Sequence, residues 1–165
     1  MKHDELIDPK SFAAKFRDEI RVGFNWDRMF HESWPIEVVA LTSPNSFVRC
    51  FMPWYIGKSG NEVAYDDPEA HPISLADVPK VLGILNIERQ DDIHRYANVF
   101  QEQKHAADFC VPSYALPKGQ HFILDRNHRL AALTLATVPF SVTLWNVRGP
   151  LEPNGLLDLI HWMPK

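Results

Sequence analysis

The chain has 165 residues, of which 45% are hydrophobic and 23% are charged, and its formal net charge is −4. This length supports one domain with a substantial core, and the composition excludes both a disordered chain and a membrane-embedded one. The negative charge disfavours a protein that holds nucleic acid mainly by neutralising phosphates, although a local basic cluster can act within an acidic chain.

The N-terminus and the cysteines indicate the cell compartment. MKHDELIDPK carries acidic residues where a secretory signal requires an apolar run, and the apolar run Ile36–Leu41 is too short to span a membrane. Cys50 and Cys110 lack C-x-x-C spacing, which indicates neither a disulfide framework nor a zinc site. We therefore expect a cytoplasmic protein with no membrane partner.

The first predicted element is a helix. Phe12, Phe16 and Ile20 recur at i, i+4 and i+8, which places them on one apolar stripe. The pattern predicts a helix from about Ser11, which can cap it, to Phe30, with an interruption at Gly23.

A β-hairpin is predicted next. The β-branched run at 36–41 and the alternating residues at 47–51 read as two strands, and the turn cluster at 43–46 joins them. Residues 56–72 are rich in glycine, proline and acidic side chains. They predict a loop, either a solvated flap or a lid over a site.

The remaining segments alternate between strands and helices. They predict, in order, a short edge strand around Ile73, a helix from Asp91 or Asp92 to about Lys104, strands at 111–116 and 121–124, a helix at 128–136, a strand at 140–147 and a short terminal helix at 156–162. The mixture predicts an α+β fold in a single domain over residues 1–165.

The stretch HFILDRNHRLAAL, residues 121–133, places polar residues where a strand meets a helix. Unpaired N–H groups and the helix dipole make the start of a helix favourable for an anion. Asn127 is a good N-cap, and His128 and Arg129 add donors where acidic residues are usual. With Arg126, they predict a phosphate or carboxylate site.

Asp125 has several possible roles beside this site. It can form an ion pair with Arg129, fix Arg126, hold a cation or ribose hydroxyl, or act as a general base. One alternative needs no ligand, because Asp125 would cap the helix and pair with Arg129. Another is a divalent metal held by His121, Asp125 and His128, a set that a nuclease could use.

Residues 119–133 also resemble a known signature. The block G-x-H-F-I-L-D-R-N-H-R-L-A-A-L is similar to that of the ParB/sulfiredoxin-like superfamily, in which a strand ends in a polar box and runs into an Ala- and Leu-rich helix. Four further segments agree in order: HPISLADVPKV at 71–81, Arg89 with the following Asp91-Asp92-Ile93, DFCVPSYALPKG at 108–119, and VPFSVTLW at 138–145. The resemblance covers roughly residues 71–148.

The resemblance implies a ParB/sulfiredoxin-like core at 71–148. The rest of the domain, which it does not cover, is the predicted helix and β-hairpin extension at 1–70 and the C-terminal helix at 149–165. The resemblance also implies a nucleotide site, with ATP or CTP and magnesium as the expected ligands. By position, the nucleotide-binding residues would be Arg89, Arg126, Asn127, His128 and Arg129, and the catalytic ones Asp125, His128 and Arg129. Sulfiredoxins carry a reactive cysteine where this chain has Asn127, so sulfinic acid reduction is not expected.

Three functions follow from these patterns. The first is a nucleotide-dependent enzyme that performs phosphoryl transfer, hydrolysis or nucleic-acid cleavage at Asp125–Arg129. The second is a regulatory module that binds a nucleotide or nucleic acid at the same anion site without turnover. The third is a structural domain in which Asp125 and Arg129 satisfy each other. The chain has no G-x-x-x-x-G-K-[ST] loop, which excludes a P-loop nucleotidase.

Overall fold

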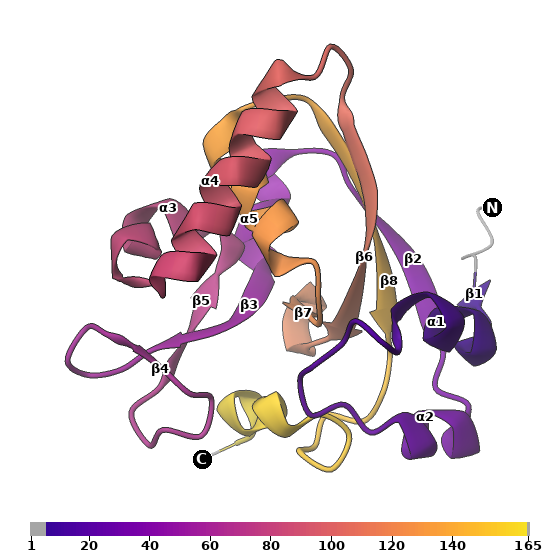
Figure 1. The fold of residues 1–165 in the computed structure, drawn as a ribbon. Coiled ribbons are helices and arrows are strands. Elements are labelled where there is room, and N and C mark those ends of the chain that lie inside the picture. Colours follow the sequence, from indigo (N-terminus) through magenta and orange to yellow (C-terminus); the bar gives the residue numbers. More distant parts are fainter. Residues whose placement is uncertain (1–5, 165) are drawn as a thin grey trace.

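Figure 1 shows a computed structural model of the chain, which describes residues 6–164. The α-helices are α1 (Pro9–Phe16), α2 (Trp26–Glu32), α3 (Val78–Val81), α4 (Ile87–Glu102) and α5 (Asn127–Ala136). The strands are β1 (Leu6–Ile7), β2 (Ile36–Leu41), β3 (Cys50–Ile56), β4 (Glu62–Val63), β5 (His71–Ser74), β6 (Ala107–Ala115), β7 (His121–Ile123) and β8 (Phe140–Val147). Short 3₁₀ helices include Pro44–Arg49 and Leu157–Trp162.

One mixed sheet organises the molecule. Its strand order is β1-β2-β8-β6-β7-β3-β4, and β5 pairs with β3. β6 and β8 are parallel, as are β3 and β7, and the other pairs are antiparallel. The predicted α+β class is therefore confirmed. No helix within residues 6–164 has both the length and the apolar character needed to cross a membrane.

Both faces of the sheet are covered. On one face, α4 and α5 lie side by side over the strands, and their apolar stripes pack on β3, β6 and β8. On the other face, α1, α2 and the Leu157–Trp162 helix cover a second cluster rich in aromatic side chains. Neighbouring residues serve opposite faces, because side chains alternate along a strand. Phe122 belongs to the second cluster and Ile123 to the first.

The N-terminal helix is shorter than the sequence predicts. α1 begins at Pro9 and is capped by Asp8, whose carboxylate accepts from the Lys10 amide at 3.1 Å, so Ser11 is not the cap. After Phe16 the chain is largely irregular as far as α2; residues 17–25 are here named the strap. Phe12, Phe16 and Ile20 are all buried in the second cluster, so their spacing marks a shared buried face and not one continuous helix.

The predicted hairpin of residues 36–51 is wrong. β2 pairs with β1 and β8, whereas β3 pairs with β4, β5 and β7. Residues 44–49 form a 3₁₀ helix that begins with Pro44 and is capped by the Ser43 side chain. This helix stands where a two-stranded hairpin would have a tight turn, and β3 joins a different part of the sheet. β3 forms antiparallel pairs with β4 and β5, which follow it in the chain.

The segment 71–148 follows its predicted order more closely. β5, β7, α5 and β8 occupy the predicted positions, and β6 begins four residues earlier than predicted. α4 also begins early, at Ile87, because Asn86 caps it and accepts from the Glu88 amide at 2.9 Å. The terminal helix is a 3₁₀ helix.

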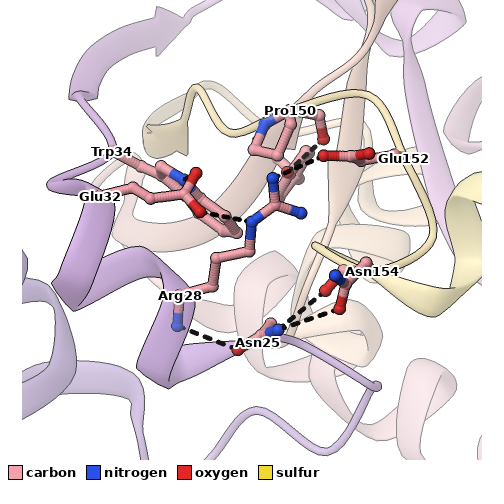
Figure 2. A network of polar contacts seen from close by, with 8 residues as sticks. Asn25, Arg28, Glu32, Trp34, Pro150, Glu152 and Asn154 are labelled. Atoms are coloured by element: carbon pink, nitrogen blue, oxygen red, sulfur yellow. Dashed lines mark hydrogen bonds and ion pairs between the residues drawn. The ribbon is translucent and has the colours of Figure 1, made fainter.

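The N-terminal and C-terminal parts of the chain are tied together. Figure 2 shows Arg28 of α2 paired with Glu152, at 2.6 Å. It also shows Asn25, whose side-chain Nδ2 donates to the Asn154 carbonyl at 2.9 Å. The Tyr114 hydroxyl donates to the Pro150 carbonyl at 2.7 Å and holds the same segment against β6. These contacts fix the strap beside the C-terminal 3₁₀ helix. The strap in turn places N-terminal residues at the start of α5.

Candidate functional site

A polar pocket of about 270 Å³ lies at the start of α5. The strap, α4 and the β7–α5 junction supply its walls. Its lining residues are Glu19, Asp92, Tyr96, Asp125, Arg126, Asn127, His128 and Arg129. The structure therefore brings the whole predicted box together and adds Glu19, Asp92 and Tyr96 to it.

The start of α5 is open toward this pocket. Arg126 is the N-cap, in the left-handed region at φ 61°, and its carbonyl accepts the first helical bond from the Leu130 amide at 3.1 Å. Asn127 is thus the first helical residue and not the predicted N-cap. The N–H groups of residues 127–129 have no partner within the helix, and no acidic side chain occupies the first turn. This end of the helix favours an anion.

Asn127 carries a further unsatisfied group. Its Oδ1 atom is buried and has no hydrogen-bond partner, the only such side-chain atom among the residues described by the structure. Burial of an unpaired acceptor costs about 1–3 kcal/mol. Asn127 lines the pocket, so this unpaired acceptor lies beside the candidate site.

Arg126 is held by the protein itself. Its Nε and Nη2 atoms donate to the two carboxylate oxygens of Glu19 at 3.1 and 3.3 Å, and its Nη1 donates to the Cys110 carbonyl at 2.8 Å. The guanidinium also lies 5.1 Å from the centre of the Phe16 ring. Arg126 therefore joins the strap to β6 and α5, and its side chain is less free for phosphate than the sequence predicts.

Glu19 and Asp125 form a carboxyl pair in the pocket. The hydrogen bond from Arg126 lowers the pKa of Glu19 and keeps it ionised. Burial, followed by the hydrogen bond and charge of Glu19, raises the pKa of Asp125. Two neighbouring carboxyl groups whose pKa values are pushed apart are suited to acid–base work, and the raised one is the candidate for moving a proton. The expected Asp125–Arg129 ion pair is not among the contacts in the described residues.

His128 lies between two charged side chains of α4. Its Nδ1 is 3.1 Å from Asp92 Oδ2, and its Nε2 is 3.3 Å from Arg89 Nη1. A neutral ring with its proton on Nδ1 satisfies both contacts, because it donates to Asp92 and accepts from Arg89. Burial, reinforced by the charge of Arg89, lowers the pKa of His128. The ring is thus held as a neutral link between α5 and α4.

This arrangement predicts that acid weakens the fold through His128. With a folded pKa below the ordinary 6.5, the unfolded chain takes up the proton first, so stability falls as pH drops through 6.5 toward the folded value. We expect wild type to lose unfolding free energy faster than His128→Gln between pH 7.5 and about 5.5. Urea unfolding at several pH values measures both slopes. His121, whose pKa burial also lowers, contributes equally to both proteins. Equal slopes would contradict the prediction.

Arg89 borders the pocket without lining it. Its Nε donates to Glu62 Oε1 at 2.9 Å, and its guanidinium lies 4.7 Å from the centre of the Trp54 ring. Arg89 reaches the predicted site only through His128. By contrast, Arg129 lines the pocket and stacks on Tyr96 at 5.5 Å, and no carboxylate within residues 6–164 is within ion-pair distance of it. Arg129 is the cation of the box that is free for a ligand.

The suggested metal ligands do not converge. His121 Nδ1 lies 3.1 Å from Asn146 Oδ1 of β8, and His121 is not among the residues that line the pocket with Asp125 and His128. Over the part of the chain that the structure describes, no group of three or more His, Cys, Asp or Glu side chains could hold a metal ion.

Sequence reasoning missed Glu19 and Asp92 as site residues. Glu19 falls in a segment predicted to be helical, and only the folding of the strap carries it to Asp125. Asp92 was considered as a helix cap, but it lies within α4, one turn after Arg89. The i, i+3 spacing of Arg89 and Asp92 places them on one helix face, which was the available signal for a shared contact with His128.

Comparisons with models of protein families, with characterised proteins and with solved structures find no match to this chain.

Proposed function

We propose that the protein binds a nucleoside triphosphate with its phosphates at the start of α5 and catalyses hydrolysis or transfer of the terminal phosphoryl group. The observation that carries this proposal is the pocket itself. It joins free helix N–H groups, the unpaired cation of Arg129 and the Glu19–Asp125 pair. The resemblance of residues 119–133 to the ParB/sulfiredoxin-like box supports the same ligand class.

The residues of the pocket have different roles in this reaction. The N–H groups of α5 and the guanidinium of Arg129 bind phosphate oxygens and stabilise the charge that develops on them. Asp125, with its raised pKa, takes the proton of the attacking water or hydroxyl group. His128 positions the helix start through Arg89 and Asp92.

Magnesium, when bound with the nucleotide, neutralises part of the phosphate charge. Both oxygens of Glu19 accept from Arg126, and no group of three or more His, Cys, Asp or Glu side chains within residues 6–164 could hold a metal ion, so the phosphates would supply most of the ligands of this ion.

A thermal-shift titration tests nucleotide binding. At about one hundred times its dissociation constant, ATP or CTP with magnesium should add about 2.7 kcal/mol to the unfolding free energy of wild type. Arg129→Ala should lose most of this gain. The matched control is Arg95→Ala, because Arg95 also stacks on Tyr96, at 5.1 Å, without lining the pocket. A gain that is equal in all three proteins, or the absence of any gain in wild type, would overturn the proposal.

A further inference from the structure

A second pocket, of about 460 Å³, lies on the other side of the Arg89–His128 contact. Arg89 lines this second pocket and His128 lines the first, so one pair of side chains separates the two. The residues that matter here are Arg21, Tyr55, Glu62, Arg89 and Asp158. Its volume is typical of a site for a small molecule.

The walls of this pocket come mostly from outside residues 71–148. The strap contributes Arg21 to Gly23, β3 and β4 contribute their facing ends, and the C-terminal 3₁₀ helix contributes Asp158. The pocket therefore gives a role to the two chain segments that the resemblance does not cover.

Backbone contacts hold these walls in place. The Leu157 amide donates to the Gly23 carbonyl at 3.1 Å, and the Asn25 amide donates to the Gly155 carbonyl at 2.9 Å. A Cβ atom at Gly23 would overlap the Leu157 side chain, which would have to move. The contacts of Arg28 and Asn25 in Figure 2 anchor the same two segments. The pocket is thus preformed and needs little ordering when it binds a ligand.

Buried polar groups lie at one side of the pocket. Tyr55 and Asp158 are 1% and 3% exposed, and the Tyr55 hydroxyl donates to Asp158 Oδ2. Buried polar groups cost free energy unless they are paired, and this pair joins β3 to the C-terminal 3₁₀ helix. Both residues line the pocket, so one of its sides is polar, which suits a ligand that carries hydroxyl groups.

The pocket is lined by two cations, Arg21 and Arg89, and two acidic residues, Glu62 and Asp158, of which Asp158 is buried and bonded to Tyr55. Arg89 is neutralised by Glu62 at 2.9 Å. Arg21 is exposed, and no acidic side chain within residues 6–164 is within ion-pair distance of it. Arg21 therefore leaves a cation free at the pocket, and a guanidinium binds carboxylates and phosphates through paired donors.

We propose that this second pocket binds a small organic anion that carries hydroxyl groups, a hydroxy acid or a polyol phosphate, with its anionic group on Arg21. Arg21 is two residues from Glu19, at most about 7 Å along the chain. The strap therefore contributes to both pockets, through Glu19 to the first and through Arg21 to the second.

Isothermal titration calorimetry without nucleotide or magnesium tests this site by itself. The probes are D-glycerate and glycerol 3-phosphate, with glycerol as the uncharged comparison. We expect wild type to bind at least one anion more tightly than glycerol, and we expect Arg21→Ala to weaken that binding by about tenfold or more. Binding of glycerate alone or of the phosphate alone identifies which anionic group the pocket takes.

Two variants make the test specific. Arg17→Ala removes an exposed arginine from the same strap and should leave binding unchanged, because Arg17 stacks on Trp26 and Phe30 away from the pocket. Arg129→Ala disables the first pocket and should also leave binding unchanged. Binding that survives Arg21→Ala, that is lost with Arg129→Ala, or that is absent in wild type would overturn this proposal. None of these results depends on nucleotide binding. The experiment can therefore contradict the second-pocket proposal without contradicting the proposed nucleotide site.

Discussion

Replacing Asp125 with asparagine should slow phosphate release from the bound nucleotide by roughly 100- to 10,000-fold, the usual contribution of a general base. The amide keeps the size of the side chain and removes the group that accepts the proton. Nucleotide affinity should stay within a few-fold of wild type, because α5 and Arg129 bind the phosphates. Malachite-green detection of phosphate measures the rate, and the thermal-shift titration measures the affinity.

Glu19→Gln gives this prediction a second readout. The charge of Glu19 raises the pKa of Asp125, so its removal should lower that pKa. The base would then stay deprotonated in more acidic solution, and the acidic limb of the pH–rate profile should move to lower pH. The matched control is Asp77→Asn, since Asp77 contacts exposed Lys80 far from the pocket lining. Full turnover by Asp125→Asn would contradict the assignment. A wild type that binds nucleotide without turnover would instead identify a binding module.

The part of the site formed by residues 125–129 could be predicted from the sequence because these residues are consecutive in the chain. An apolar strand, a polar box and a run of helix formers specify β7, the junction and α5 by short-range rules alone. Asp125 to Arg129 therefore appear in one pocket, as expected. Even here the cap is displaced by one residue, because Arg126 adopts φ 61°, a conformation that sequence patterns seldom assign to arginine.

The long-range part could not be predicted in the same way. The sequence Ser43-Pro44 fits both a tight turn and the start of a 3₁₀ helix. In the structure it begins a 3₁₀ helix, and β3 pairs with β7. The stripe of Phe12, Phe16 and Ile20 correctly marks buried residues but not where α1 ends. Glu19 lies in the pocket with Asp125 because of the path that the strap takes. Tertiary contacts decide such features, and local propensity is too weak to specify them.

Removing the Arg126 side chain should produce the largest loss of stability among single changes at the site. Arg126→Ala deletes a bidentate ion pair with Glu19, a hydrogen bond to the Cys110 carbonyl and the contact with the Phe16 ring. Charged hydrogen bonds contribute about 1.5–3 kcal/mol each in partly buried settings, and these are partly coupled. We expect the unfolding free energy to fall by about 2–4 kcal/mol, as measured by urea denaturation.

Arg126→Gly separates the contribution of the Arg126 side chain to stability from that of its backbone conformation. A left-handed conformation costs an L-residue about 1–2 kcal/mol, which glycine avoids, although glycine gains more freedom in the unfolded chain. We therefore expect the glycine variant to be about 0.5–1 kcal/mol more stable than the alanine variant but less stable than wild type. Lys80→Ala removes an exposed, weakly paired cation and should change stability little. If glycine matched wild type, the side-chain contacts of Arg126 would contribute only the roughly 0.5–1 kcal/mol that glycine gains over alanine, and the strap would have to be held at the site mainly by its contacts with the C-terminal segment.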